Sequence, residues 1–232
     1  MEVLKNGNEV IYLNEKENID IYYAIEKKSY KIIKELKNDK RSLVLYIETE
    51  TIPSKKIVLK IPKEKNSRKW QRFLSIFRGS ESKREFLNCE FILENGFLGA
   101  APLVAVEKKH GIIVVDSYFV LTFISGKHAG FENISLALET LYKIHDKGYT
   151  HGDSQLPNFI INDQDVYLID CKLKKIHFGI LSKIKEFIYF EKSCHRDIES
   201  KYKKNSLYNL MKKIDIYVDK FNYFTKKIRG KS

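Results

Sequence analysis

The sequence is poor in the residues that mark disulfide-rich, linker-rich and membrane-spanning proteins. Its three cysteines, Cys89, Cys171 and Cys194, lie far apart and form no CxxC pair. This spacing argues against a cysteine zinc site and suits a reducing compartment. Four prolines and eleven glycines provide no long flexible linker. The most apolar region, residues 111–126, is interrupted by Asp116 and is too short to span a bilayer.

The first ten residues contain no apolar segment of signal-peptide length. We therefore expect a cytoplasmic protein. With 232 residues, of which 43% are apolar and 12% aromatic, the chain is long enough to bury a good core and is not mainly disordered.

The net charge of +12 is concentrated near the C-terminus. Residues 171–232 hold 17 Lys and Arg against 6 Asp and Glu, whereas residues 1–170 hold 25 against 24. A solvated lysine-rich face is the usual meaning of such a distribution. The alternative is a surface for an anionic partner, such as an acidic membrane, a phosphorylated glycolipid or a nucleic acid.

The strongest chemical signal is the string YTHGDSQLPNFIIN, which begins at Tyr149. In it Asp153 precedes Asn158 by five residues, and Asp170 follows after a second apolar run. Phosphoryl transfer from a nucleotide needs a carboxylate to orient the attacking hydroxyl and hard oxygen ligands for Mg²⁺. The base and the metal-binding Asn of the protein-kinase catalytic loop have the same spacing. We therefore predict a phosphotransferase with Asp153 as base and with Asn158 and Asp170 as Mg²⁺ ligands.

Each of these residues has a simpler reading as a turn or cap residue. That reading fits Asp170 poorly, because it ends an apolar strand and its charge would be costly to bury without a partner. His151 is expected to be architectural and to take no direct part in the chemistry.

Three positions in the first half are candidates for contacts with ATP. Lys60 lies inside an apolar strand, where a buried ammonium needs a partner. Glu85 is the preferred partner besides the nucleotide phosphates, with Glu90 and Lys56 as reserves, although Glu85 also fits a helix capping box with Ser82. The segment LTFISG, which begins at residue 121 and includes Phe123 and Ile124, fits a hinge whose backbone pairs with adenine.

Apolar periodicity separates a strand-rich first part from a helix-rich second part. Residues 10–62 are expected to be rich in strands, with turns at 38–40 and 52–54. The expected strands of the first part span residues 42–48, 56–62, 103–106, 111–115 and 118–124. The expected helices span 82–94, 131–147 and most of the chain from about residue 182. Two short strands at 159–161 and 166–169 flank a turn.

This order predicts an α+β, two-lobed protein-kinase-like fold with one main helix in its strand-rich N-lobe. Residues 1–126 would form the N-lobe and hinge, and residues 127–232 a helix-rich C-lobe with a basic C-terminus.

With these residues in place, the chain resembles the lipopolysaccharide core heptose(II) kinase family of small bacterial sugar kinases. The resemblance covers essentially the whole chain and is carried by Val58–Lys60, Lys83–Phe86, Tyr149–Asp153, Asn158–Phe159 and Leu168–Asp170. It implies ATP- and Mg²⁺-dependent phosphorylation of a heptose in the inner core of lipopolysaccharide. The acceptor would be a glycolipid at the cytoplasmic face of the inner membrane, which the basic C-terminal third would contact peripherally.

The chain also departs from protein kinases. It has no G-x-G-x-x-G loop in the first part, so the turn at residues 37–41 is the candidate phosphate cover. Gly152 stands in place of the Arg of H-R-D, Gln155 in place of the Lys two residues after the base, and Lys172 could supply positive charge near the transferred phosphate.

Two alternatives stay open. One is a kinase for another small molecule, an antibiotic or a protein Ser/Thr. The other, from a different class, is an inactive basic pseudokinase scaffold that binds lipid or nucleic acid, although the intact Asp153, Asn158 and Asp170 set argues against it.

Overall fold

The computed structural model describes residues 1–49, 56–63 and 79–228. Internal contacts divide the chain into two compact units, Met1–Ser125 and Gly126–Ser232. The turn expected at residues 52–54 lies outside the described residues. No helix in the described part of the chain combines the length and the apolar character needed to cross a bilayer.

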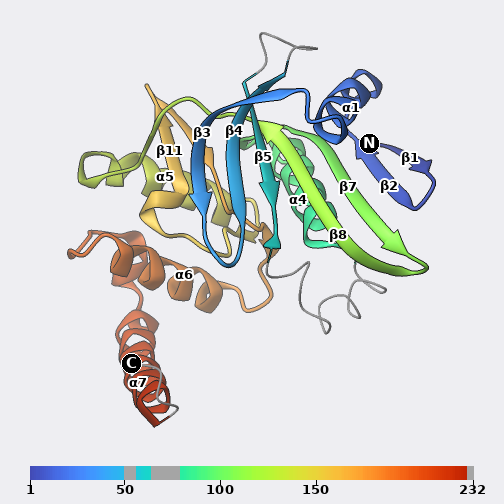
Figure 1. Ribbon diagram of the computed structural model, residues 1–232. Coiled ribbons are helices and arrows are strands. Elements are labelled where there is room, and N and C mark those ends of the chain that lie inside the picture. Colours follow the sequence, from blue (N-terminus) through green and yellow to red (C-terminus); the bar gives the residue numbers. More distant parts are fainter. Residues whose placement is uncertain (50–55, 64–78, 229–232) are drawn as a thin grey trace. The chain divides into compact units, whose positions relative to one another are not determined.

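A seven-stranded antiparallel sheet forms most of the first unit (Figure 1). Its strand order is β1-β2-β7-β8-β5-β4-β3. The strands of this unit are β1 (Glu2–Asn6), β2 (Glu9–Leu13), β3 (Tyr30–Asn38), β4 (Leu43–Thr49), β5 (Ile57–Ile61), the two-residue β6 (Leu98–Gly99), β7 (Pro102–His110) and β8 (Ile113–Thr122). Its helices are η1 (Lys16–Asn18), α1 (Ile19–Glu26) and α4 (Glu81–Glu94).

The two faces of this sheet are buried by alternate residues of the same strands. Val104 and Val106 belong to a large cluster that includes three residues of α1. Ala105, between them, belongs to a second cluster with Phe86 of α4 and Phe119 of β8. Each face therefore has its own apolar cover, and α4 packs against β7 and β8 (Figure 1).

One expectation about the strands of the first unit was wrong. The strands expected at 111–115 and 118–124 are one strand, β8, and the preceding turn lies at residues 111–112. Residues 108–110, where the turn was expected, instead continue β7, and Lys108 pairs with Glu9 and Glu26 at 3.1 and 2.6 Å. In addition, residues 19–26, which fall in the region expected to be rich in strands, form α1.

Helix α4 begins one residue earlier than expected. Ser80 is its N-cap and accepts a hydrogen bond from the Lys83 N–H at 3.0 Å. Ser82, the expected cap, is inside the helix, and its hydroxyl bonds to that of Ser117 at 3.0 Å. The capping box of Ser82 and Glu85 is therefore wrong, and Glu85 has no capping role.

The second unit is richer in helix. Its helices are η2 (Phe131–Asn133), α5 (Ile134–Asp146), η3 (Leu156–Asn158), α6 (Ile180–Ser193), η4 (Lys201–Lys204) and α7 (Ser206–Ile228). Its strands are β9 (Lys127–His128), β10 (Tyr149–Thr150), β11 (Phe159–Asn162), β12 (Asp165–Leu168) and β13 (Lys174–Lys175). The hairpin of β11 and β12 pairs Phe159 with Leu168, so the residues on either side of it are brought together.

Candidate active site

The loop between β10 and β11 carries Asp153 and Asn158 and is closed by a bond between them. The Asn158 side-chain amide Nδ2 donates to the Asp153 backbone oxygen at 2.9 Å. Because the amide nitrogen is used in this way, the Oδ1 atom is the part of Asn158 available to a cation. Both residues are partly buried.

Asp170 lies next to Asn158 through the strand ladder. The Ile169 N–H donates to the Asn158 backbone oxygen at 3.0 Å, one step beyond the Phe159–Leu168 pair. Asp170 itself is exposed and has a φ of +48°. Its charge is therefore not buried, contrary to expectation. What marks this residue is its left-handed backbone, which is uncommon outside glycine and clusters at functional sites.

A buried carboxylate, Glu186 of α6, anchors the start of the loop. Its two oxygens accept the backbone N–H groups of His151 and Gly152 at 2.9 and 2.7 Å. Its backbone oxygen accepts the Ser154 hydroxyl at 3.1 Å. Charge-assisted bonds of this kind are stronger than neutral ones, so Glu186 fixes the backbone on both sides of Asp153.

Glu186 is itself held in place by two other buried side chains, His145 and Tyr202. His145 Nε2 lies 2.8 Å from Glu186 Oε2, and His145 Nδ1 lies 2.6 Å from the Tyr202 hydroxyl. Burial and nearby Asp146 raise the pKa of Tyr202, so its hydroxyl stays protonated and can donate to His145. This chain of bonds links η4, α5 and α6 to the loop.

Gly152 has two structural reasons to be glycine. Its φ is +85°, a conformation that side chains disfavour. A Cβ atom at this position would also lie 2.8 Å from the Lys172 backbone oxygen. The segment after Asp170 therefore passes too close to the loop for an Arg at this position.

His151 is fully buried and neutral. Burial lowers its pKa to about 4, and its Nδ1 atom accepts the Asp153 N–H at 3.4 Å. Its backbone oxygen accepts the Lys172 N–H at 2.8 Å. These contacts are structural and fit the architectural role expected for His151.

Tyr189, also on α6, contacts the expected base directly. Its hydroxyl donates to Asp153 Oδ1 at 3.2 Å and accepts from Gln155 Nε2 at 2.6 Å. The side chain that replaces the protein-kinase Lys thus reaches Asp153 through Tyr189. Neither Tyr189 nor Glu186 was identified from the sequence. The one available signal was a Glu among the apolar residues of α6.

In the first unit, the structure brings Lys60 and Glu85 together. Lys60 Nζ lies 2.8 Å from Glu85 Oε2, and both side chains are mostly buried. Of the reserves, Glu90 lies 3.9 Å from the N-terminal amine, and Lys56 is exposed. The ion pair therefore joins the centre of the sheet to α4.

The expected hinge residues follow β8 directly. The Phe123 N–H donates to the Lys56 backbone oxygen at 2.9 Å, and its ring stacks on Tyr46. This N–H is therefore engaged and is not offered to adenine, whereas Ile124 lies just beyond the strand. The turn expected to cover phosphates is the β3–β4 turn, where Asp39 Oδ1 accepts the N–H groups of Arg41 and Ser42, both at 2.8 Å.

The residues near Asp153 suit a hard divalent cation. Asn158 and Asp170, whose backbones the Ile169–Asn158 bond brings together, both carry oxygen donors, and Mg²⁺ typically takes one or two such protein ligands together with phosphates and water. Among the described residues, no group of three or more His, Cys, Asp and Glu side chains is placed to hold a metal. The donor set thus fits a metal that is shared with a nucleotide.

The order of strands and helices and a likeness to a solved structure define a kinase-like fold. A solved structure, WaaP in complex with acyl carrier protein, matches 94% of this chain and 98% of its own at 13% identity, with a TM-score of 0.52. This likeness confirms the α+β fold. PpkA-294 in its apo form matches 61% of this chain and 58% of its own at 16% identity, with a TM-score of 0.42.

The particular family follows from the sequence. The family model "Lipopolysaccharide core biosynthesis protein (WaaY)" matches residues 3–231, and the chain belongs to this family. The resemblance drawn from the motifs is thereby confirmed. The chain is a kinase of lipopolysaccharide core biosynthesis, and such kinases imply the use of ATP and a divalent metal.

Proposed function

We propose that the protein is a heptose(II) kinase, which transfers the γ-phosphate of ATP to a heptose hydroxyl of the lipopolysaccharide inner core. The observation that carries this proposal is the loop of Asp153 and Asn158, closed on itself by one hydrogen bond and held beside Asp170 by another. Membership of the family indicates the lipopolysaccharide core as the acceptor. The roles proposed for Asp153, Asn158 and Asp170 explain the chemistry.

Asp153 is proposed to orient the acceptor hydroxyl and to take its proton. One carboxylate oxygen, Oδ1, is engaged by Tyr189, so Oδ2 is the oxygen that would accept from the sugar. As the sugar oxygen bonds to the γ-phosphorus, the bond from that phosphorus to the bridging oxygen breaks and ADP leaves. The proton passes to Asp153 and then to solvent.

We also propose residues that contact the nucleotide and its metal. Lys60, oriented by Glu85, would bind the α- and β-phosphates, and Ile124 would offer backbone groups to adenine, with Phe123 contributing its carbonyl. Asn158 and Asp170 would hold Mg²⁺, which neutralises charge on the transferred phosphate when it is bound. Lys172 is exposed beside this loop and is a further candidate source of positive charge.

The acceptor is proposed to approach from an anionic membrane surface, at the cytoplasmic face of the inner membrane. Five lysines of the basic C-terminal third were candidates for that contact: Lys201, Lys203, Lys204, Lys212 and Lys213. Three of them form ion pairs within the unit, Lys201 with Asp146, Lys203 with Glu191 and Asp197, and Lys212 with Glu191. Lys204 and Lys213 are thus the better candidates of this set.

The direct test is phosphate transfer from labelled ATP to purified lipopolysaccharide that lacks core phosphate, with Mg²⁺. We expect transfer by the wild type and its loss in Asp153→Asn. Asp163→Asn is the matched control, because Asp163 is an exposed carboxylate in the β11–β12 turn. Asp153-dependent ATP hydrolysis without transfer would reject this acceptor, and an absence of ATP binding would favour the scaffold alternative.

A further inference from the structure

The last helix of the chain, α7, is attached to its unit through a polar face. Near its start, Tyr208 is buried, and its hydroxyl donates to Glu191 Oε2 at 2.7 Å. One turn on, Lys212 Nζ donates to the same oxygen at 3.2 Å. Burial alone would raise the pKa of Glu191. The bonds from Lys203, Tyr208 and Lys212 nevertheless hold that pKa below its ordinary range. Glu191 is therefore a charged anchor for the helix.

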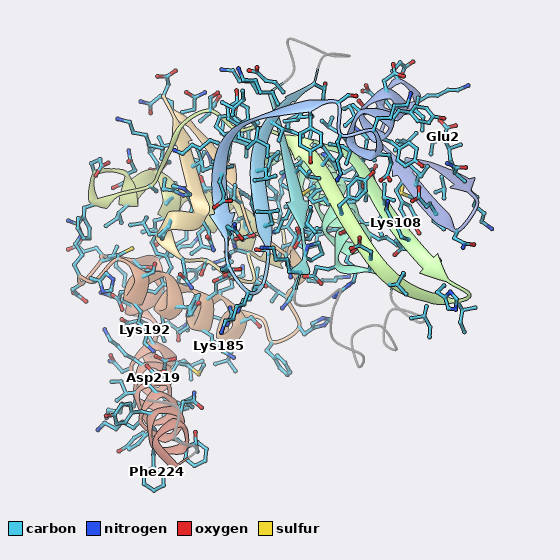
Figure 2. All side chains as sticks on the ribbon, in the orientation of Figure 1. Glu2, Lys108, Lys185, Lys192, Asp219 and Phe224 are labelled. Carbon is cyan, nitrogen blue, oxygen red and sulfur yellow. The ribbon has the colours of Figure 1, made fainter. Side chains whose placement is uncertain are left out.

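The attachment continues along the same face of α7. Lys192 of α6 pairs with Asp215 and, at 2.6 Å, with Asp219 (Figure 2). The four residues of α7 that make these contacts, at positions 208, 212, 215 and 219, recur every three or four positions. They therefore lie along one side of the helix. That side faces α6.

An apolar row lies on the other side of α7. Because each residue of a helix is rotated by about 100° from the one before, this row lies roughly half a turn around the helix from the residues that contact α6. All its members are exposed, with fractions from 46% to 71%. The row comprises Leu210, Ile214, Tyr217, Phe221 and Phe224, and Phe224 lies near the free end of the helix (Figure 2). A contiguous exposed patch of this kind marks an interaction surface.

Positive charge borders this row. Lys213 and Lys220, seven residues apart, lie along one edge of it by helical position, and both are exposed. Neither forms an ion pair with a described residue. The whole helix carries five lysines and two aspartates, and both aspartates are paired with Lys192. The outward side of α7 is therefore apolar and cationic.

We propose that the outward side of α7 lies in the surface of an anionic lipid bilayer, with its apolar row among the acyl chains and Lys213 and Lys220 against the headgroups. Aromatic and aliphatic residues opposite a polar face, edged by lysine, are the composition of helices that lie in the membrane interface. This inference does not depend on the identity of the sugar acceptor.

A second copy of the chain fits the same side less well. Helix pairs favour branched aliphatic residues in their seam, whereas three of the five residues in this row are aromatic. If the α7 helices of two copies packed antiparallel, their lysine-lined edges would also face each other, and the like charges would repel. The charge of the helix, in contrast, is complementary to an acidic lipid surface.

Vesicle co-sedimentation tests this proposal. The full-length protein is mixed with phosphatidylglycerol–phosphatidylethanolamine vesicles or with neutral phosphatidylcholine vesicles. We expect binding to the anionic vesicles only, weakened about tenfold or more by Tyr217→Ser/Phe221→Ser/Phe224→Ser and, at low salt, by Lys213→Glu/Lys220→Glu. The controls are Ile112→Ser, which alters an isoleucine that is 71% exposed elsewhere, and Lys5→Glu/Lys31→Glu, which reverses two exposed lysines of the first unit.

A second readout does not depend on the folding of the multiple variants. Phe221→Trp should show a blue shift of its added emission on anionic vesicles, relative to the wild-type background. No shift, or wild-type binding by the triple serine variant, would overturn the proposal. A concentration-dependent dimer in sedimentation equilibrium that the triple serine variant abolishes, without vesicle binding, would overturn it in favour of a second copy.

Discussion

The Tyr189 hydroxyl donates a hydrogen bond to Asp153 Oδ1 at 3.2 Å while it accepts one from Gln155 at 2.6 Å. The proposed base is thus positioned by a side chain that follows it in the chain by more than thirty residues. A hydrogen bond to one carboxylate oxygen fixes which oxygen faces the acceptor, and this defines a positioning role for Tyr189.

Removal of this hydroxyl should slow the chemical step. We expect Tyr189→Phe to lower kcat about tenfold, the effect of losing one hydrogen bond to a charged group, with the KM for ATP unchanged. Steady-state kinetics and an unfolding curve measure both effects. Tyr23→Phe, which alters a half-exposed tyrosine of α1, is the control. An unchanged kcat would exclude the positioning role.

Loss of the Glu186 carboxylate should affect both stability and activity. The carboxylate oxygens accept three N–H groups, and an amide in their place offers one acceptor oxygen. Glu186→Gln should therefore lower the free energy of unfolding by about 2–4 kcal/mol and disorder the loop. Urea unfolding measures the loss, and Glu139→Gln, on an exposed site of α5, should change little. Equal stability of the two variants would contradict the anchoring role.

His151 should make the protein sensitive to acid. Its pKa is lowered from 6.5 in the unfolded chain to about 4 in the folded state, so the unfolded state binds more protons between these values. The free energy of unfolding should consequently fall as the pH drops from 6.5 towards 4, by as much as about 3 kcal/mol from this group. In His151→Asn that part of the slope should vanish. Parallel pH–stability curves for both proteins would count against a neutral buried His151.

Gly152 and Gly148 form a matched pair for testing the crowded loop. Both have a φ of +85°, but a Cβ atom at Gly148 meets nothing within 4 Å, whereas one at Gly152 lies 2.8 Å from a backbone oxygen. Alanine at Gly148 should cost about 1 kcal/mol from backbone strain alone, and alanine at Gly152 about 1–3 kcal/mol more. Thermal unfolding compares the two, and equal costs would show that the loop has room for a side chain.

The ion pair in the first unit should act on the nucleotide. Lys60→Met should lower kcat/KM for ATP about a hundredfold, and Glu85→Gln about tenfold, with less than additive effects in the double variant because the two side chains act as one unit. Lys56→Met, the exposed lysine of the same segment, should leave kcat/KM near the wild-type value. Additive losses would argue that Lys60 and Glu85 act separately.

The sequence predicted the features that depend on local pattern. The spacing of Asp153 and Asn158, the apolar strand around Lys60 and the stripe of α5 each follow from residues close together in the chain. The merging of two expected strands into β8 was missed because Ser117, a polar residue between them, is buried against Ser82 of α4, which is distant in sequence.

The supporting residues of the loop were missed for a similar reason. Glu186 and Tyr189 lie more than thirty residues after the loop residues that they bond, and only the fold brings α6 against the loop. Asp170 was selected as a candidate ligand for a reason that the structure overturns, since it is exposed and distinguished by its backbone conformation.

The most direct test of the proposed function is to locate the phosphate that the protein adds. Lipopolysaccharide lacking core phosphate is incubated with ATP, Mg²⁺ and either wild type or Asp153→Asn, and the core oligosaccharide is then fragmented and analysed by mass spectrometry. A heptose(II) kinase should add one phosphate to the second heptose, and the variant should add none. Phosphate on another sugar, or equal incorporation by both proteins, would contradict the proposed function.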